Sequence, residues 1–67
     1  MARLIDVIEV ISQSDQSWEH AAQRALEEAS KTVRHIQSIY GQEFVAEVND
    51  GKITQFRLNA KISFELE

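Results

Sequence analysis

Arg57 is the residue whose type and expected setting give the most scope for chemistry. It lies in the middle of a segment that alternates like a strand, and we expect Tyr40, Phe44 and Gln55 on the same sheet face. Its guanidinium group could bind a phosphate through two parallel hydrogen bonds, or could stack on a planar ring. The other interpretation is a structural ion pair with a Glu of a neighbouring subunit. The sequence leaves both roles open.

Trp18, the two histidines and Asp50 have simpler structural interpretations. Trp18 is expected to anchor a corner of the core, with ligand stacking as the alternative. His20 and His35 lie fifteen residues apart on one predicted helix, so they cannot share a site within one chain, and we interpret each as a helix-surface residue. Asp50 is expected to serve the backbone of a turn rather than a metal ion.

Signatures of enzymes and of nucleic-acid binding are missing from the sequence. It contains no glycine-rich phosphate loop and no nucleophile elbow, and its eleven Asp and Glu residues form no recognisable acid/base pair. There is no Cys for thiolate chemistry or a structural zinc site. A net charge of −4 opposes binding to phosphate backbones. The sequence therefore predicts a protein that is not an enzyme and does not bind nucleic acid.

One strand and one long helix are expected in the first half of the chain. Residues 3–11 are rich in Ile and Val and predict a strand. Ser14 is the expected helix N-cap, and positive charge in residues 31–35 suits the last turn of a helix about 30 Å long. The apolar positions recur at helical spacing. They are Trp18, Ala21, Ala22, Ala25, Leu26, Ala29 and Val33.

The second half of the chain predicts a β-hairpin. Asp50-Gly51 is a pair favoured in two-residue type I′ turns. If these residues form the loop, the register of the two strands is fixed, and a slip by one residue would exchange their faces. The expected pairs are Asn49 with Lys52, Phe44 with Arg57, and Ser38 with Ser63.

The two faces of this hairpin have different predicted partners. The face that should meet the helix is almost unbroken in its apolar alternation on the last strand, and Gly41 opposite Ala60 would let the helix approach closely. Glu43 and Glu47 would fall on the same face, so we expect a bulge or an uncovered end of the sheet. The other face combines aromatic and aliphatic residues with polar ones. We therefore interpret it as a subunit interface, or as a pocket formed there.

Length and composition favour one domain that self-associates. A chain of 67 residues buries only about 60% of the surface that its unfolded form exposes, and no disulfide is available to compensate. Asp6 and Glu9 interrupt the apolar N-terminal run, so we expect no signal peptide, and no stretch reaches the length of a membrane span. We therefore expect a cytoplasmic homo-oligomer without a membrane partner.

The whole chain, residues 1–67, resembles the dodecin family, and in particular a branch that lacks the flavin-stacking Trp. The resemblance implies an α+β fold. A β-α-β-β subunit would wrap a three-stranded antiparallel sheet around one long helix, and twelve subunits would form a hollow sphere. The residues that carry the resemblance are Val7-Ile8-Glu9-Val10, residues 14–22, Ala29-Ser30-Lys31-Thr32-Val33-Arg34, Gly51-Lys52-Ile53 and Ile62-Ser63-Phe64-Glu65-Leu66.

The resemblance also implies a function in storing small ligands at subunit interfaces. Flavin-binding dodecins hold flavin (FMN, FAD or riboflavin) between Trp side chains, and a neighbouring Gln contacts the ring. Here Ser38 stands at the position of the Trp and Arg57 at that of the Gln, which removes stacking worth roughly 1–3 kcal/mol per ring. The expected ligand-binding residues are Ser38, Tyr40, Gln55 and Arg57.

The alternative is a calcium-binding or purely structural shell without flavin. The resemblance includes relatives without the Trp that bind calcium. A charge of −4 on every subunit accumulates in an assembly and attracts cations. Calcium prefers six to eight oxygen ligands, which carboxylates around symmetry axes could supply. The sequence does not identify which carboxylates would do so.

Overall fold

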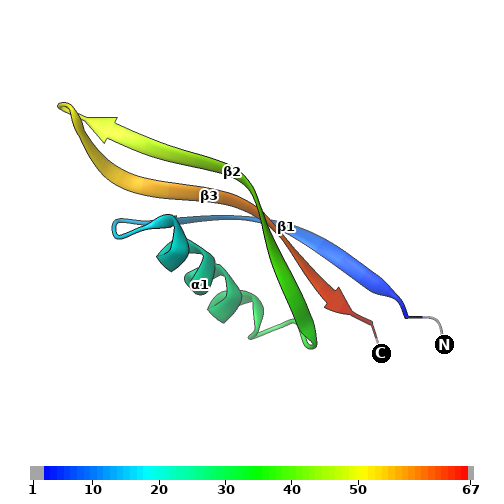
Figure 1. Ribbon diagram of the computed structural model, residues 1–67. Coiled ribbons are helices and arrows are strands. Elements are labelled where there is room, and N and C mark those ends of the chain that lie inside the picture. The colour runs from blue at the N-terminus through cyan, green and yellow to red at the C-terminus, as the bar shows by residue number, and fades with distance from the viewer. Residues whose placement is uncertain (1–2, 67) are drawn as a thin grey trace.

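Residues 3–66, the part of the chain that the computed structural model describes, form a three-stranded antiparallel sheet with one helix against it (Figure 1). The elements are β1 (Ile5–Ser14), α1 (Trp18–Ala29), β2 (Ile36–Asn49) and β3 (Lys52–Glu65). The strand order is β1-β3-β2, so the last strand lies in the centre. The tip of the β2–β3 hairpin extends beyond the helix (Figure 1). This arrangement confirms the predicted α+β subunit.

The core lies between α1 and the central strand. Leu58, Ala60 and Ile62 of β3 are almost completely buried, as the alternation predicted, and they face Ala21 and Ala25 of the helix. Alanine side chains allow the helix to lie close to the sheet, but each buries little apolar area. The core of one subunit is therefore small.

The hairpin turn has the predicted type. Asp50 and Gly51 both have positive φ, 54° and 77°, as a type I′ turn requires, and Asn49 pairs with Lys52. Gly51 accommodates this conformation because it has no Cβ. The right-handed twist of the strands that leave such a turn contributes to the curvature of the sheet in Figure 1.

Two β-bulges, one on each strand of the hairpin, change the register on which the face assignment depended. Gly41 pairs with Ala60 as predicted, but the register then shifts so that Phe44 lies opposite Leu58. The predicted pairing of Phe44 with Arg57 is therefore wrong. Counted from the turn, the register first shifts at Thr54, an extra residue of β3 between the paired positions Ile53 and Gln55. Gln42, an extra residue of β2, then restores the predicted register at Gly41.

The two register shifts together decide the faces of residues 43–47. Phe44 joins the helix side, whereas Glu43 and Glu47 move to the uncovered face. This resolves the conflict in the sequence pattern through the bulge that was expected there. A Cβ on Gly41 would come within 2.7 Å of Cζ of Phe44, so the missing side chain leaves room for the ring.

The helix is shorter than predicted. Its N-cap is Ser17, whose side chain accepts a hydrogen bond from the backbone N–H of His20 at 2.9 Å, because β1 continues as far as Ser14. Its C-terminal end is at Ala29, and His35 has φ of 61° outside the helix, so the predicted last turn at residues 31–35 is wrong. No helix within residues 3–66 is long and apolar enough to cross a bilayer.

Candidate functional site

The sheet face opposite the helix is uncovered in the subunit and mixes apolar with polar side chains. By alternation from the buried residues of β3, this face carries Gln55, Arg57 and Lys61 on the central strand. Ile11 on β1 and Tyr40 on β2 flank them and are 69% and 65% exposed. A face of this kind can bind a planar ligand or a second protein surface, but it cannot serve as a core within the subunit.

Arg57 forms an ion pair within the chain. Its Nη1 lies 2.9 Å from Oε2 of Glu47 on the adjacent strand, and both side chains are more than a third exposed. An ion pair of Arg57 with a Glu of a neighbouring subunit stays a prediction. The register shift between Glu47 and Val48, where β3 has the extra residue Thr54, places Glu47 on the face of Arg57.

The four predicted ligand-binding residues lie in two groups on the sheet. Ser38 pairs with Ser63, and the two hydroxyl groups are hydrogen-bonded, while Tyr40 is opposite Lys61. Gln55 and Arg57 lie near the hairpin tip. Ser63 and Arg57 are six residues apart on β3, which corresponds to about 20 Å. One subunit does not bring the two groups together, so the shared site stays a prediction that needs more than one copy.

Trp18 is an anchor between the helix and the hairpin, as predicted. Its indole Nε1 donates a hydrogen bond to the backbone carbonyl of Val45 at 3.2 Å. Its ring packs edge-to-face against Phe56, with centroids 4.9 Å apart, and against Phe44 at 6.0 Å. Because both its polar atom and its ring are engaged in the subunit, a core role explains this side chain.

His20 is tied to the end of β1, which its interpretation as a surface residue did not include. Its Nδ1 lies 2.6 Å from Oγ of Ser14, which also accepts a hydrogen bond from the backbone N–H of Gln16. Ser14 is 5% exposed and is the one polar residue classed as buried among the residues that the structure describes. The pair therefore connects the first strand to the first turn of the helix.

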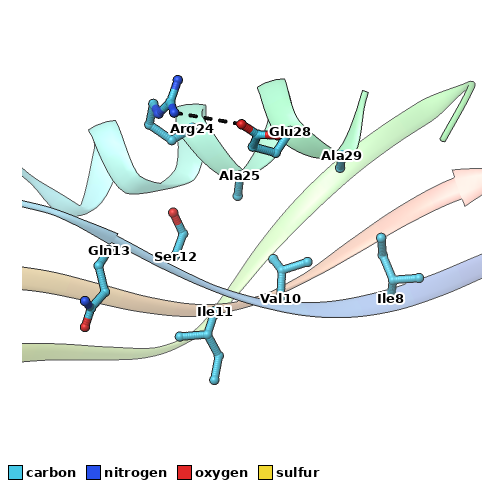
Figure 2. A pocket seen from close by; sticks show the side chains of 9 residues that line it. All are labelled: Ile8, Val10, Ile11, Ser12, Gln13, Arg24, Ala25, Glu28 and Ala29. Atoms are coloured by element: carbon cyan, nitrogen blue, oxygen red, sulfur yellow. Dashed lines mark ion pairs between the residues drawn. The ribbon is translucent and has the colours of Figure 1, made fainter. Parts of the chain in front are cut away.

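A groove between β1 and α1 is the feature that sequence reasoning missed. It has a volume of about 490 Å³, and Figure 2 shows Ile8 and Val10 directed from β1 towards Ala25 and Ala29 of the helix. The alanine stripe was the available signal, since small side chains on a helix leave space above a strand. Ile11 points away from the groove, towards the uncovered face.

Carboxylates on the uncovered face take part in hydrogen bonds between strands. Besides the pair of Glu47 with Arg57, Oε1 of Glu43 accepts a hydrogen bond from Nδ2 of Asn59 at 3.1 Å. Within residues 3–66 of one subunit, no group of three or more His, Asp or Glu side chains is placed to hold a metal ion.

Comparison with known proteins agrees with this geometry. The dodecin family model matches residues 4–67, while no curated protein matches. A variant of the Thermus thermophilus dodecin has 24% identity and a TM-score of 0.92, and the match covers 98% of each chain. The Streptomyces coelicolor dodecin has 25% identity and a TM-score of 0.90 over 97% of this chain and 93% of that chain.

A third similar solved structure is that of a relative described as binding calcium. The calcium dodecin of Mycobacterium tuberculosis, described as a calcium-chelating immunodominant antigen, has 32% identity and a TM-score of 0.80. The match covers 96% of this chain and 91% of that chain. Since the family model covers nearly the whole sequence and the strand order and helix agree, the chain belongs to the dodecin family of small, non-enzymatic binding proteins.

Proposed function

We propose that the chain assembles into a homododecameric shell that holds flavin or a flavin-like ligand at its subunit interfaces, as a member of the branch without the stacking Trp. The uncovered sheet face carries this proposal. It exposes Val7, Ile11 and Tyr40, which lie outside the small core of the subunit. Burying such a face against further copies is the available way to stabilise so short a chain.

The proposed ligand site combines residues from the two groups on this face. Tyr40 supplies an exposed aromatic ring in place of the missing Trp, and Ser38 lies two residues before it. Arg57, held by Glu47, offers a guanidinium that can stack or donate hydrogen bonds to a ring, with Gln55 beside it. Because the groups are separated along one subunit, two copies must meet to complete the site.

Fluorescence titration of riboflavin and of FMN tests the flavin proposal. We expect quenching with a dissociation constant in the range of tens of micromolar, since one aromatic plane is missing. Tyr40→Ala should weaken binding by about tenfold, because loss of a stacked ring costs roughly 1–3 kcal/mol. Tyr40→Phe keeps the ring and is the matched control. Absence of quenching by either flavin at these concentrations would overturn the flavin proposal.

Calcium binding by the shell is the second candidate function. It is favoured by the two register shifts, which place Glu43 and Glu47 on the uncovered face, and by the calcium chelation of the Mycobacterium tuberculosis relative. Copies that meet at this face could combine their carboxylates, as calcium requires. We expect calcium to raise the thermal unfolding midpoint relative to chelator, with magnesium as the control. An unchanged midpoint would contradict a specific calcium site and leave a purely structural shell.

A further inference from the structure

A second pocket lies between α1 and β2, on the side of the sheet that the helix covers. It has a volume of about 280 Å³. The helix packs mainly on β1 and β3 and contacts β2 less. Phe44 is therefore 61% exposed, although it lies opposite the buried Leu58 on the helix side. The pocket is the space between this ring and the first turns of the helix.

The base of the pocket is apolar. Ala22 of the helix, Ile39 of β2 and Leu58 of β3 line it with aliphatic groups. Gly41 also lines it, and its missing side chain leaves space beside the ring of Phe44. The volume lies slightly below the range of pockets for drug-sized ligands, which is about 300–1,000 Å³. The pocket therefore suits a small molecule with a compact apolar surface.

Two aromatic rings form walls of the pocket. Trp18 and Phe44 both line it, with ring centroids 6.0 Å apart and ring planes at 78°. The indole N–H of Trp18 is bonded to the carbonyl of Val45, so towards a ligand the ring offers its π surface. Ring faces attract cations, and aromatic cages of this kind recognise methylated ammonium groups. Trp18 can form such a wall while it anchors the helix to the hairpin.

Glu19 adds a negative charge to the two rings. It belongs to the first turn of α1 and is the one charged residue that lines the pocket within residues 3–66. Among these residues its carboxylate has no ion-pair or hydrogen-bond partner. The helix dipole accounts for a Glu in the first turn, and the same charge gives the pocket a preference for cations.

The hydrogen-bonding capacity of the lining distinguishes between types of cation. Apart from Glu19, the side chains that line the pocket within the described residues offer no hydrogen-bond acceptor. A primary ammonium ion has three N–H donors, which lose their water on entry and need acceptors in its place. A quaternary ammonium ion has no N–H group and presents methyl groups instead. The lining therefore suits a quaternary ammonium ion better than a primary amine.

We propose that the corner formed by Trp18, Glu19 and Phe44 binds a small quaternary ammonium compound. The positive charge lies beside the Glu19 carboxylate, and its methyl groups pack on the two rings and on the aliphatic base of the pocket. This site is on the opposite side of the sheet from the uncovered face. It therefore goes beyond the proposed function and does not depend on it.

Titration with choline tests the proposal. Trp18 is the single Trp of the chain, so tryptophan fluorescence reports on this pocket. For the assembled wild-type protein at constant ionic strength, we expect a saturable change with a dissociation constant on the order of 1 mM. Neohexyl alcohol, the neutral compound with carbon in place of the choline nitrogen, should bind at least about tenfold more weakly. Equal affinity for both compounds, or no saturable response to choline, would overturn the proposal.

Two variants separate the carboxylate from the ring. Glu19→Gln keeps the size of the side chain and should weaken choline binding about fivefold without changing the affinity for neohexyl alcohol. Glu27→Gln, on the same helix but outside the pocket, changes the net charge equally and should leave both affinities unchanged. Phe44→Leu removes one wall and should weaken choline binding about fivefold. Thermal unfolding checks that each variant is folded. Equal effects of Glu19→Gln and Glu27→Gln would mean that net charge alone attracts choline, and would overturn the site.

Competition with flavin separates this inference from the proposed function. Choline should leave the fluorescence titration of riboflavin unchanged, because the two proposed sites lie on opposite sides of the sheet. Displacement of riboflavin by choline would mean one shared site and would overturn the proposed pocket. Binding of choline without binding of riboflavin would support the pocket and overturn the flavin proposal alone.

Discussion

The two faces of the sheet are built from the same three strands but meet different surroundings. On the helix side, Leu58, Ala60 and Ile62 are 3%, 0% and 0% exposed. On the opposite side, Ile11 and Tyr40 remain largely exposed. The first face is buried by the helix of the same chain, and the second has apolar side chains that the chain alone does not cover. In a small sheet with alternating side chains, one face can thus form the core of the subunit while the other face is available for assembly.

The largest expected effect contrasts two isoleucines on opposite faces. Ile62→Ala should lower the free energy of unfolding by about 2–5 kcal/mol, because it leaves a cavity in the core. Ile11→Ala should change the free energy of unfolding of the subunit by no more than about 0.5 kcal/mol, and it should instead weaken self-association. Denaturant unfolding at two protein concentrations distinguishes these effects. Equal effects of both substitutions would mean that the two faces do not differ as described.

A second prediction concerns the bulge that assigns side chains to their faces. Gly41→Ala places a methyl group where the ring of Phe44 lies and should cost about 1–3 kcal/mol through overpacking. The ring should move away from Trp18, with a change in tryptophan fluorescence. The double variant Gly41→Ala/Phe44→Ala has no ring to displace and serves as the control. If adding Gly41→Ala to Phe44→Ala costs as much as adding it to the wild type, the steric explanation fails.

A third prediction concerns the link between β1 and the helix. Ser14→Ala removes the partner of both His20 and the Gln16 N–H, and it should cost about 1–2 kcal/mol because these groups lose a buried hydrogen-bond partner. Ser12→Ala on the same strand is the matched control, for which a smaller loss is expected. Thermal unfolding of both variants at one concentration measures the difference. Equal losses would show that the Ser14 contacts contribute nothing particular.

The smallest expected effect belongs to the polar pair on the uncovered face. Glu47→Gln should change subunit stability by less than about 1 kcal/mol, since ion pairs between exposed side chains contribute little. It should change flavin or calcium binding more than stability, because it alters the charge of the proposed site. Titration of the same variant measures this. A large loss of stability with unchanged binding would assign the pair a purely structural role.

The sequence predicted the parts of the fold that local chemistry determines. Asp50-Gly51 dictates its own turn, and the alternation around Leu58 and Ile62 identifies the buried face. The helix was extended too far because Lys31 and other helix-compatible residues continue after Ala29, although the chain there turns towards β2.

The arrangement of the candidate site depended on features that local patterns do not determine. Two extra residues, Thr54 on β3 and Gln42 on β2, reversed the faces of the segment between them, and neither polarity nor turn type located these residues beforehand. The groove beside β1 could not be derived from alanine spacing alone, because its size depends on how the helix lies over the strands. The face of Ser38, Tyr40 and Arg57 was predictable, whereas the faces of Phe44 and Glu47 required the register.

Native mass spectrometry of the untreated purified protein tests the central claim most directly, because it reports subunit number and bound mass together. The account predicts an assembly of twelve subunits of 7.7 kDa each. A folded, heat-resistant species with the mass of one subunit would contradict the claim that the uncovered face is buried against further copies.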